Sequence, residues 1–282
     1  MAVILDGKTL AAQIKEEIKA EVEKLAASGV KPKLTAVLVG DDPGSVVYAR
    51  SKGKACAGVN MDYELHHLPE STPEAEVIDL LGKLNTDQSV HGILVEFPLP
   101  KHINKWRVLD ALSPLKDVDG MTAVNRGRLL AGEEGLFPAT PQSCIEIMER
   151  YGIEMAGKHA VLVGRGETVG RPLILMLLRR NATITICHTR TKDVAHHTRQ
   201  ADILVAAAGR AGLITADMLK PGAVVVDAGI NPAEKGICGD VDFERAQEVA
   251  GYITPVPGGV GSLTTTIIMK NVLKAIALQG TR

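Results

Sequence analysis

The 282-residue sequence has few aromatic side chains and no excess of charge of either sign. Phe, Trp and Tyr together make up 3% of it, and 32 Lys and Arg stand against 33 Asp and Glu. Nucleic-acid-binding proteins usually show a basic excess, and single-strand binders stack bases on aromatic rings. The composition therefore argues against a nucleic acid as partner.

Cysteine is also scarce, and its four copies lie far apart, at Cys56, Cys144, Cys187 and Cys238. They show neither Cys-X-X-Cys pairs nor the Cys/His spacing of a zinc site. The adjacent histidines at 66–67 and 196–197 would point to different faces of a helix or strand, so we predict no metal. Unpaired cysteines are typical of a reducing compartment.

Long apolar runs and a targeting signal are missing as well. No apolar run approaches the roughly 18–20 residues that span a membrane. The first residues, MAVILDGKTL, lack the basic region and cleavage site of a signal peptide. We therefore expect a cytoplasmic protein that does not bind membranes.

Two kinds of segment alternate along the chain. Short runs rich in β-branched residues predict strands at 35–39, 92–95, 160–163, 183–186, 203–206 and 223–226. Longer amphipathic segments predict helices at 8–27, 45–59, 73–84, 141–151 and 169–180. This alternation is typical of βαβ units and predicts an α/β fold with parallel sheets.

The length predicts about two domains. Residues 116–135 interrupt the alternation with glycines and mixed charge, which indicates a crossing between domains. We therefore assign residues 1–120 to a first domain and residues 121–263 to a second. The last amphipathic segment, within 264–282, is expected to pack back on the first domain.

A glycine-rich turn follows the predicted strand at 160–163. Gly164, Gly166 and Gly170 form a GxGxxxG pattern that leads into a predicted helix. Such a turn lets the backbone approach a dinucleotide pyrophosphate, and the N-terminus of the helix favours an anion. The spacing departs from GxGxxG, so a tight turn without a ligand is the alternative.

The next strand ends about twenty residues on, where this kind of site holds the cofactor ribose. Instead of an acidic residue the sequence offers Thr189, Arg190 and Lys192, together with Arg165 from the turn. These donors suit a 2′-phosphate and favour NADP over NAD. An ordinary solvated loop is the alternative.

Tyr48 and Lys52 are four residues apart in a predicted helix, and Ser45 lies one turn earlier. A phenol beside an amine suits proton transfer and ring binding, although an ordinary exposed helix face shows the same pattern. Glu96 directly follows the strand at 92–95, at the end where α/β proteins bind ligands.

Two further segments are unusual. The sequence KDVDG at 116–120 places two acids at the expected domain crossing. The sequence TPVPGGVGS at 254–262 is either a plain connector or a wall of backbone beside a ligand.

Taken in order, these segments resemble the bifunctional methylenetetrahydrofolate dehydrogenase/methenyltetrahydrofolate cyclohydrolase family over essentially the whole chain. The resemblance rests on DGK at 6–8, SVVYARSK at 45–52, EFPLP at 96–100, KDVDG at 116–120, GRGETVGRP at 164–172 and YITPVPGGVG at 252–261. Their joint occurrence is far more specific than any one of them.

The resemblance implies two α/β domains with parallel sheets and a cleft between them: an N-terminal catalytic, folate-binding domain and a Rossmann-like NADP-binding domain. It implies NADP-dependent oxidation of 5,10-methylenetetrahydrofolate to 5,10-methenyltetrahydrofolate, then hydrolysis to 10-formyltetrahydrofolate. These reactions belong to one-carbon metabolism and serve purine biosynthesis. The family resemblance also implies a homodimer.

By the same resemblance Tyr48 packs on the folate rings, Lys52 is essential for the cyclohydrolase step and Asp119 fixes the pterin. The positions that match cofactor contacts are Gly164, Arg165, Gly166, Thr189 and Ile230, and our own reading of the loop adds Arg190. The positions that match a loop beside the folate and nicotinamide are Pro257, Gly258 and Gly259.

The sequence departs from the family pattern at Glu96, where glutamine is usual and is thought to orient the lysine. An ionised Glu96 beside Lys52 would favour the charged amine and make it a poorer base. We therefore hypothesise a weakened or pH-shifted cyclohydrolase. Gly166 also replaces a common serine, and Ser262-Leu263 replaces a frequent Pro-Met.

Three alternatives stay open. The first is a monofunctional methylenetetrahydrofolate dehydrogenase that has lost the hydrolysis step because of Glu96. The second is an unrelated NADP-dependent dehydrogenase of a small carbonyl acid, which leaves Tyr48, Lys52 and Asp119 unexplained. The third is an NADP-sensing binding module without turnover.

Overall fold

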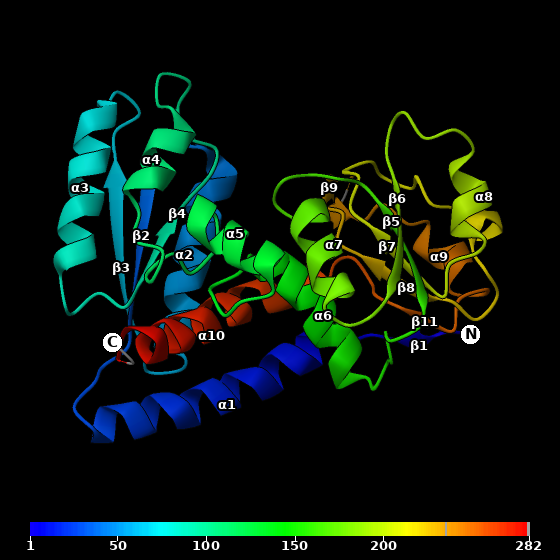
Figure 1. Cartoon of the computed structure of the whole chain (residues 1–282), viewed down its shortest axis with the longest axis horizontal. Coiled ribbons are helices and arrows are strands. Elements are labelled where there is room, and N and C mark those ends of the chain that lie inside the picture. The colour runs from blue at the N-terminus through cyan, green and yellow to red at the C-terminus, as the bar shows by residue number, and fades with distance from the viewer. Residues whose placement is uncertain (235, 281–282) are drawn as a thin grey trace. The chain divides into compact units, whose positions relative to one another are not determined.

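The computed structural model describes residues 1–234 and 236–280 (Figure 1). The chain forms two compact units, one of Met1–Ala12 with Thr140–Thr264 and one of Gln13–Ala139 with Thr265–Arg282. We call them the large-sheet unit and the small-sheet unit. Each contains a parallel sheet, so the predicted two-domain α/β class is confirmed. The final two positions of the segment predicted at 264–282 lie outside the described residues.

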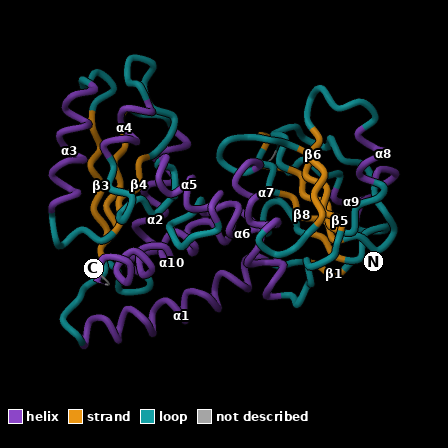
Figure 2. Tube along the Cα trace, viewed as in Figure 1, coloured by secondary structure: helices purple, strands orange, loops and turns teal. Residues whose placement is uncertain are grey.

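The large-sheet unit is built on six parallel strands, which Figure 2 shows gathered in one layer. Their order is β1 (Val3–Ile4), β11 (Tyr252–Ile253), β8 (Val224–Asp227), β7 (Ile203–Ala206), β5 (His159–Val163) and β6 (Thr183–Cys187). Its helices are α6 (Ala139–Arg150), α7 (Gly170–Leu178), α8 (Val194–Thr198) and α9 (Phe243–Ala246), with a 3₁₀ turn at Ala216–Met218. A short antiparallel pair joins β9 (Asn231–Pro232) to β10 (Ile237–Cys238). Every residue of β7 and β8 is buried, so this sheet forms the core of its unit.

The small-sheet unit has three parallel strands in the order β3 (Asp62–Leu68), β2 (Lys33–Val39) and β4 (Gly92–Val95). Its helices include α2 (Pro43–Ala57), α3 (Glu74–Thr86), α4 (Lys105–Ala111) and α5 (Ala123–Ala131). Helices α1 (Gly7–Ala27) and α10 (Val260–Gly280) contribute residues to both units.

Side-chain amides fix α10 within the small-sheet unit. The Nδ2 group of Asn271 donates to the carbonyl oxygens of Val118 at 2.7 Å and Phe137 at 2.9 Å. Nearer the C-terminus, Nε2 of Gln279 donates to the carbonyl oxygens of His91 at 3.0 Å and Leu115 at 3.2 Å. Paired polar groups such as these hold a buried helix in one register.

The predicted strands and helices all occur, with ends that differ by a few residues, as is usual for element boundaries. Strand β3 was not predicted, because its sequence DYELHHL contains no apolar run. Helix α5 lies inside the segment 116–135 that we predicted as an irregular crossing. It begins after Thr122, whose Oγ1 accepts from the Asn125 amide, and ends at Gly132 with φ 77°.

Within the ranges 1–234 and 236–280, no helix is both long and apolar enough to cross a membrane. The same ranges contain no group of three or more His, Cys, Asp or Glu side chains placed to hold a metal ion.

Candidate active site

Helix α2 carries Lys52 on its buried side. Asp42 caps this helix by accepting from the Ser45 amide, and Pro43 occupies its first turn. The Ser45 hydroxyl donates to Oδ1 of Asp42 at 2.8 Å and also lies 3.1 Å from the Phe97 carbonyl oxygen. These contacts tie the start of α2 to the segment that follows β4.

Lys52 and Glu96 form a buried ion pair. The Lys52 ammonium donates to Oε1 of Glu96 at 2.7 Å and to Oε2 at 3.0 Å. The two side chains are only 10% and 9% exposed. Coulomb attraction is strong in such a water-poor site, so the two side chains hold each other in place.

Tyr48 lies one helical turn before Lys52, and its ring centroid is 5.9 Å from the Lys52 ammonium nitrogen. The tyrosine is 53% exposed, so a flat ligand can reach its ring while the amine stays buried beneath. Cys56, one turn after Lys52, is fully buried, and this burial raises the pKa of its thiol to about 12. That thiol is therefore inert at neutral pH.

The two acids of KDVDG have different roles in the structure. Asp117 is buried and accepts hydrogen bonds from the Met121 amide, the Thr122 amide and Nδ2 of Asn125. These donors use its oxygens to close the turn before α5. Its role is structural, because its hydrogen-bonding capacity is taken up by the protein itself.

Asp119 has fewer partners of its own. Its Oδ1 accepts from the Ala139 amide at 3.1 Å. Burial, opposed by that hydrogen bond, raises the pKa of Asp119 to about 7, and neighbouring Asp117 adds to the rise while Lys52 opposes it. A carboxylate kept in a dry site without a full set of donors is suited to receive N–H donors from a ligand.

The small-sheet unit thus brings together four predicted site residues: Tyr48, Lys52, Glu96 and Asp119. Lys52 and Glu96 are also close enough to influence the protonation of Asp119. The group offers a ring, an amine and a carboxylate acceptor within one unit.

The predicted dinucleotide turn lies at the carboxyl ends of the large-sheet strands. The Gly164 amide donates to the Cys187 carbonyl at 2.9 Å, which joins the ends of β5 and β6. Gly164 has φ +123°, and any Cβ there would collide with the Ala207 backbone. A Cβ on Gly170 would lie 2.7 Å from the Arg165 Cα, whereas one on Gly166 would meet nothing within 4 Å. The first and last glycines are required by close packing, and Gly166 faces open space.

The start of α7 is suited to an anion. Its cap residue, Val169, supplies no side-chain acceptor to the first turn. Arg165, Thr189 and Arg190 are exposed at the same edge, and the Arg190 amide is fixed by Nδ1 of His188 at 3.1 Å. Two guanidinium groups at this edge fit the phosphates of a dinucleotide, including a 2′-phosphate.

Asp240, which no sequence motif indicated, is buried beside the loops that follow β7 and β8. Its Oδ2 accepts from the amides of Ala208 at 2.6 Å and Gly209 at 2.9 Å. Its Oδ1 accepts from the Arg210 amide and from Nδ2 of Asn231, both at 2.8 Å. This fully buried carboxylate therefore joins the loops that follow β7 and β8.

Asp227, at the end of β8, lies beside Asp240 and accepts hydrogen bonds from the amides of Gly229 and Val241. Burial raises the pKa of Asp227 to about 6, against those hydrogen bonds, and Asp240 adds to the rise. Ile230, a predicted cofactor contact in the same loop, is 53% exposed. The buried carboxylates of Asp227 and Asp240 thus fix the loop, and the exposed side chain of Ile230 remains available to a ligand.

The predicted ligand wall at Pro257–Gly259 is held by the DGK motif. The Lys8 amide donates to the Gly258 carbonyl at 3.2 Å, and a Cβ on Gly7 would collide with the Gly259 carbonyl. Asp6 caps the start of α1 by accepting from the Lys8 and Thr9 amides. The sequence of DGK does not indicate this structural role, and only the contact reveals it.

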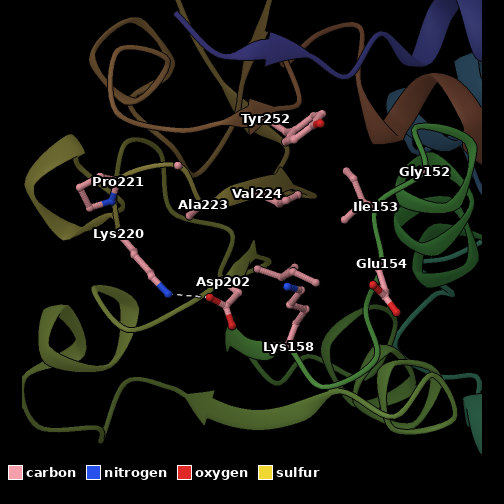
Figure 3. Close-up of a pocket in the computed structure, with 12 residues that line it drawn as sticks. Gly152, Ile153, Glu154, Lys158, Asp202, Lys220, Pro221, Ala223, Val224 and Tyr252 are labelled. Atoms are coloured by element: carbon pink, nitrogen blue, oxygen red, sulfur yellow. Dashed lines mark hydrogen bonds and ion pairs between the residues drawn. The ribbon is translucent and has the colours of Figure 1, made fainter.

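A cavity of about 350 Å³ lies elsewhere in the large-sheet unit (Figure 3). It is lined by Lys158, Asp202, Lys220 and Tyr252 among others, and Nζ of Lys220 lies 2.6 Å from Oδ1 of Asp202. Lys158 and Asp202 directly precede β5 and β7, so the cavity opens at the amino ends of the strands. Ligands of α/β sheets bind at the carboxyl ends, and this cavity is therefore not the predicted cofactor site.

Comparison with known protein families covers both parts of the chain. Residues 5–119 match the model of the tetrahydrofolate dehydrogenase/cyclohydrolase catalytic domain. Residues 138–280 match the model of the NAD(P)-binding domain of tetrahydrofolate dehydrogenase/cyclohydrolase.

Individual relatives agree along their whole length. The bifunctional protein FolD of Pelotomaculum thermopropionicum is 63% identical over 281 residues, which are 99% of each chain. The crystal structure of the bifunctional FolD of Campylobacter jejuni superposes with a TM-score of 0.97 at 44% identity, covering 99% of this chain and 100% of that one. The Trypanosoma brucei FolD, solved with NADP and an inhibitor, gives a TM-score of 0.95 at 34% identity and covers 100% and 99% of the two chains.

Proposed function

The chain belongs to the tetrahydrofolate dehydrogenase/cyclohydrolase family, as its motifs predict, and on this premise we propose that it carries out both reactions. It oxidises 5,10-methylenetetrahydrofolate with NADP and then hydrolyses the methenyl product to 10-formyltetrahydrofolate. The grouping of Tyr48, Lys52 and Asp119 in one unit carries this proposal. The product is a formyl donor for one-carbon metabolism, including purine biosynthesis.

We assign folate binding to the small-sheet unit and cofactor binding to the large-sheet unit. Asp119 accepts N–H donors of the pterin, and Tyr48 packs against the flat ring system. The pyrophosphate is held by Gly164, Gly166 and the start of α7. The 2′-phosphate is bound by Arg165, Thr189 and Arg190. Ile230 packs against the cofactor, and Pro257–Gly259 line the site. NADP, when bound, is the hydride acceptor. The contribution of the protein to oxidation is then chiefly to orient the reactants.

The hydrolysis step depends on Lys52. A water molecule adds to the methenyl carbon, and one of its protons passes to the neutral amine of Lys52, which leaves a hydroxyl group on that carbon. One ring C–N bond then breaks as the hydroxyl proton moves to the departing nitrogen, and the carbon stays on the other nitrogen as the formyl group. An amine can take this proton only in its neutral form. Because an acid, Glu96, contacts this amine at 2.7 Å, we propose that hydrolysis is slow relative to oxidation. The same distance supports the second candidate, a dehydrogenase whose cyclohydrolase activity is weak.

Two optical signals test these proposals. Oxidation is followed by NADPH formation, and hydrolysis by loss of methenyl absorbance. Lys52→Ala should abolish the second signal, and Asp119→Ala should weaken both by loosening the pterin. Lys54→Ala is the matched control, because Lys54 is exposed on the same helix. Unchanged hydrolysis in Lys52→Ala would remove the assigned role, and NADP binding without turnover would favour a sensing module.

We further propose a cytoplasmic homodimer that binds neither nucleic acid nor membranes. All four cysteines are free, which fits a reducing compartment. Strand β6 is an edge of the large sheet, and Ile186 on it is 40% exposed. Edge strands with exposed apolar side chains are common at interfaces. Light scattering should give twice the chain mass, and Ile186→Lys should lower it; a monomeric wild type would contradict the dimer.

A further inference from the structure

The cavity at the amino ends of the large-sheet strands has no part in the reactions proposed above. It measures about 350 Å³, within the range of roughly 300–1,000 Å³ that is usual for small-molecule sites. We call it the amino-end cavity. Its lining includes Ile153, Glu154, Lys158, Asp202, Val224 and Tyr252, all within the large-sheet unit (Figure 3).

Part of the lining is apolar. Ile203 and Val224, the first residues of β7 and β8, are 1% and 8% exposed. Figure 3 shows the ring of Tyr252 and the side chain of Ile153 around Val224, and both residues are half-buried. Such a surface favours an apolar or aromatic group, and a ligand ring can pair with that of Tyr252.

Another part of the lining carries an ion pair that needs no ligand. Nζ of Lys220 lies 2.6 Å from Oδ1 of Asp202. The other carboxylate oxygen, Oδ2, accepts from the His159 amide at 2.9 Å. The charge of Asp202 is thus matched within the protein, so this side of the cavity offers a ligand no net charge.

Two further charges line the cavity without such a pairing. Glu154 and Lys158 both come from the segment that joins α6 to β5. Both are exposed, and within the described residues neither side chain forms an ion pair or a hydrogen bond. The pKa of Asp202 is lowered chiefly by Lys220, and Lys158 adds little to this effect. One ammonium and one carboxylate are therefore available beside the apolar lining.

A ligand that matches these features carries a carboxylate, an ammonium and an apolar side chain. Its carboxylate would accept from Lys158 and its ammonium would donate to Glu154, both in charge-assisted hydrogen bonds. Its side chain would cover Val224 and remove apolar surface from water. A simple anion would instead be repelled by Glu154, and a simple cation by Lys158.

We propose that the amino-end cavity binds a free amino acid with an apolar or aromatic side chain. The dinucleotide turn follows the carboxyl end of β5, whereas the cavity lies at the amino ends of the same sheet. The amino acid and NADP can therefore be bound at the same time. Binding here needs no turnover, so it is independent of the proposed function.

Titration calorimetry with L-phenylalanine as the probe tests this site. The wild-type protein should bind phenylalanine at one saturable site, with the same affinity in the presence and absence of NADP. Two analogues each lack one charge: 3-phenylpropionate has no ammonium and phenethylamine has no carboxylate. Each should bind about fivefold more weakly, which is the loss expected for one exposed ion pair.

Two variants assign the charges to their partners. In Lys158→Met, phenylalanine should lose its advantage over phenethylamine and keep its advantage over 3-phenylpropionate. In Glu154→Gln the two outcomes should be reversed. Arg245→Gln and Glu248→Gln remove exposed charges of the same unit that do not line the cavity, and they should leave all three affinities unchanged.

Three results would overturn the assignment of this cavity. The first is a wild-type protein that shows no saturable binding of phenylalanine. The second is displacement of phenylalanine by NADP, which would place it at the cofactor site. The third is an advantage that survives in the variant expected to remove it, which would place the bound phenylalanine elsewhere on the protein.

Discussion

Replacing Glu96 by glutamine should speed hydrolysis without changing oxidation. The carboxylate contacts the Lys52 ammonium at 2.7 and 3.0 Å, with both side chains about one-tenth exposed. Glutamine keeps the shape and one hydrogen-bond acceptor but removes the negative charge. The neutral amine, which is the form able to accept a proton from water, should then become more populated.

The magnitude follows from the geometry. Two unit charges in contact attract by at least about 4 kcal/mol at an effective dielectric constant near 20, and breaking a buried pair costs about 3–5 kcal/mol. The glutamine acceptor recovers part of this, which leaves a change of about 2–3 kcal/mol in favour of the neutral amine. At 1.4 kcal/mol per factor of ten, hydrolysis should accelerate by about 30- to 140-fold.

The assay compares both optical signals in wild type and Glu96→Gln between pH 6 and 9. We expect the ratio of hydrolysis to oxidation to rise, and the pH profile of hydrolysis to move toward lower pH. In a Lys52→Ala background the same change at Glu96 should have no effect, because the amine through which it acts is absent. An unchanged ratio and pH profile in Glu96→Gln would refute the reasoning.

Three further predictions concern other parts of the site. Because the pKa of Asp119 is raised to about 7, its charged form lowers the stability of the folded protein. Asp119→Asn should therefore stabilise the free enzyme by about 2–4 kcal/mol at pH 8, and this gain should shrink as the pH falls from 7 to 4. The same substitution should raise the KM for folate above pH 7. Denaturant titrations across this pH range check the first effect, and a constant difference would contradict it. Asp240→Asn should raise the KM for NADP about tenfold, because it weakens the hydrogen bonds that hold the loops after β7 and β8. The KM for folate should stay within twofold of the wild-type value. Equal changes in both KM values would indicate general damage to the fold. Gly164→Ala should destabilise the fold by about 2 kcal/mol or more. The control Gly166→Ala should change the Tm little, because its added methyl group meets nothing within 4 Å. Calorimetry of the two variants measures this difference in stability.

The strands and helices with a continuous apolar pattern were predictable from sequence, but other elements were not, β3 and α5 among them. Strand β3 is an edge strand whose residues are mostly half-buried, so it needs no apolar run. The sequence of helix α5 contains both of its capping residues, Thr122 at its start and Gly132 at its end. The mixed charge between them obscured a helix that the capping residues would have marked.

The candidate site shows a similar division. The family motifs pointed to Lys52, Glu96 and Asp119, but not to the difference between the two acids of KDVDG. That difference depends on which backbone amides turn back toward Asp117, and this is set by the tertiary fold. The buried position of Asp240 could not be predicted from sequence, because nothing in the sequence distinguishes an acid that accepts from buried amides from an acid on the surface.

The way each unit is assembled from distant parts of the chain has a consequence for biosynthesis. Strand β1, at residues 3–4, pairs with β11, at residues 252–253, and the small-sheet unit takes its last helical residues from 265 onward. Neither unit is complete when the ribosome has made the first half of the protein. Chains that must wait for such distant partners fold slowly and expose apolar surface in the meantime. The two units should therefore resist expression as separate contiguous fragments, and the nascent chain should be a natural client of chaperones.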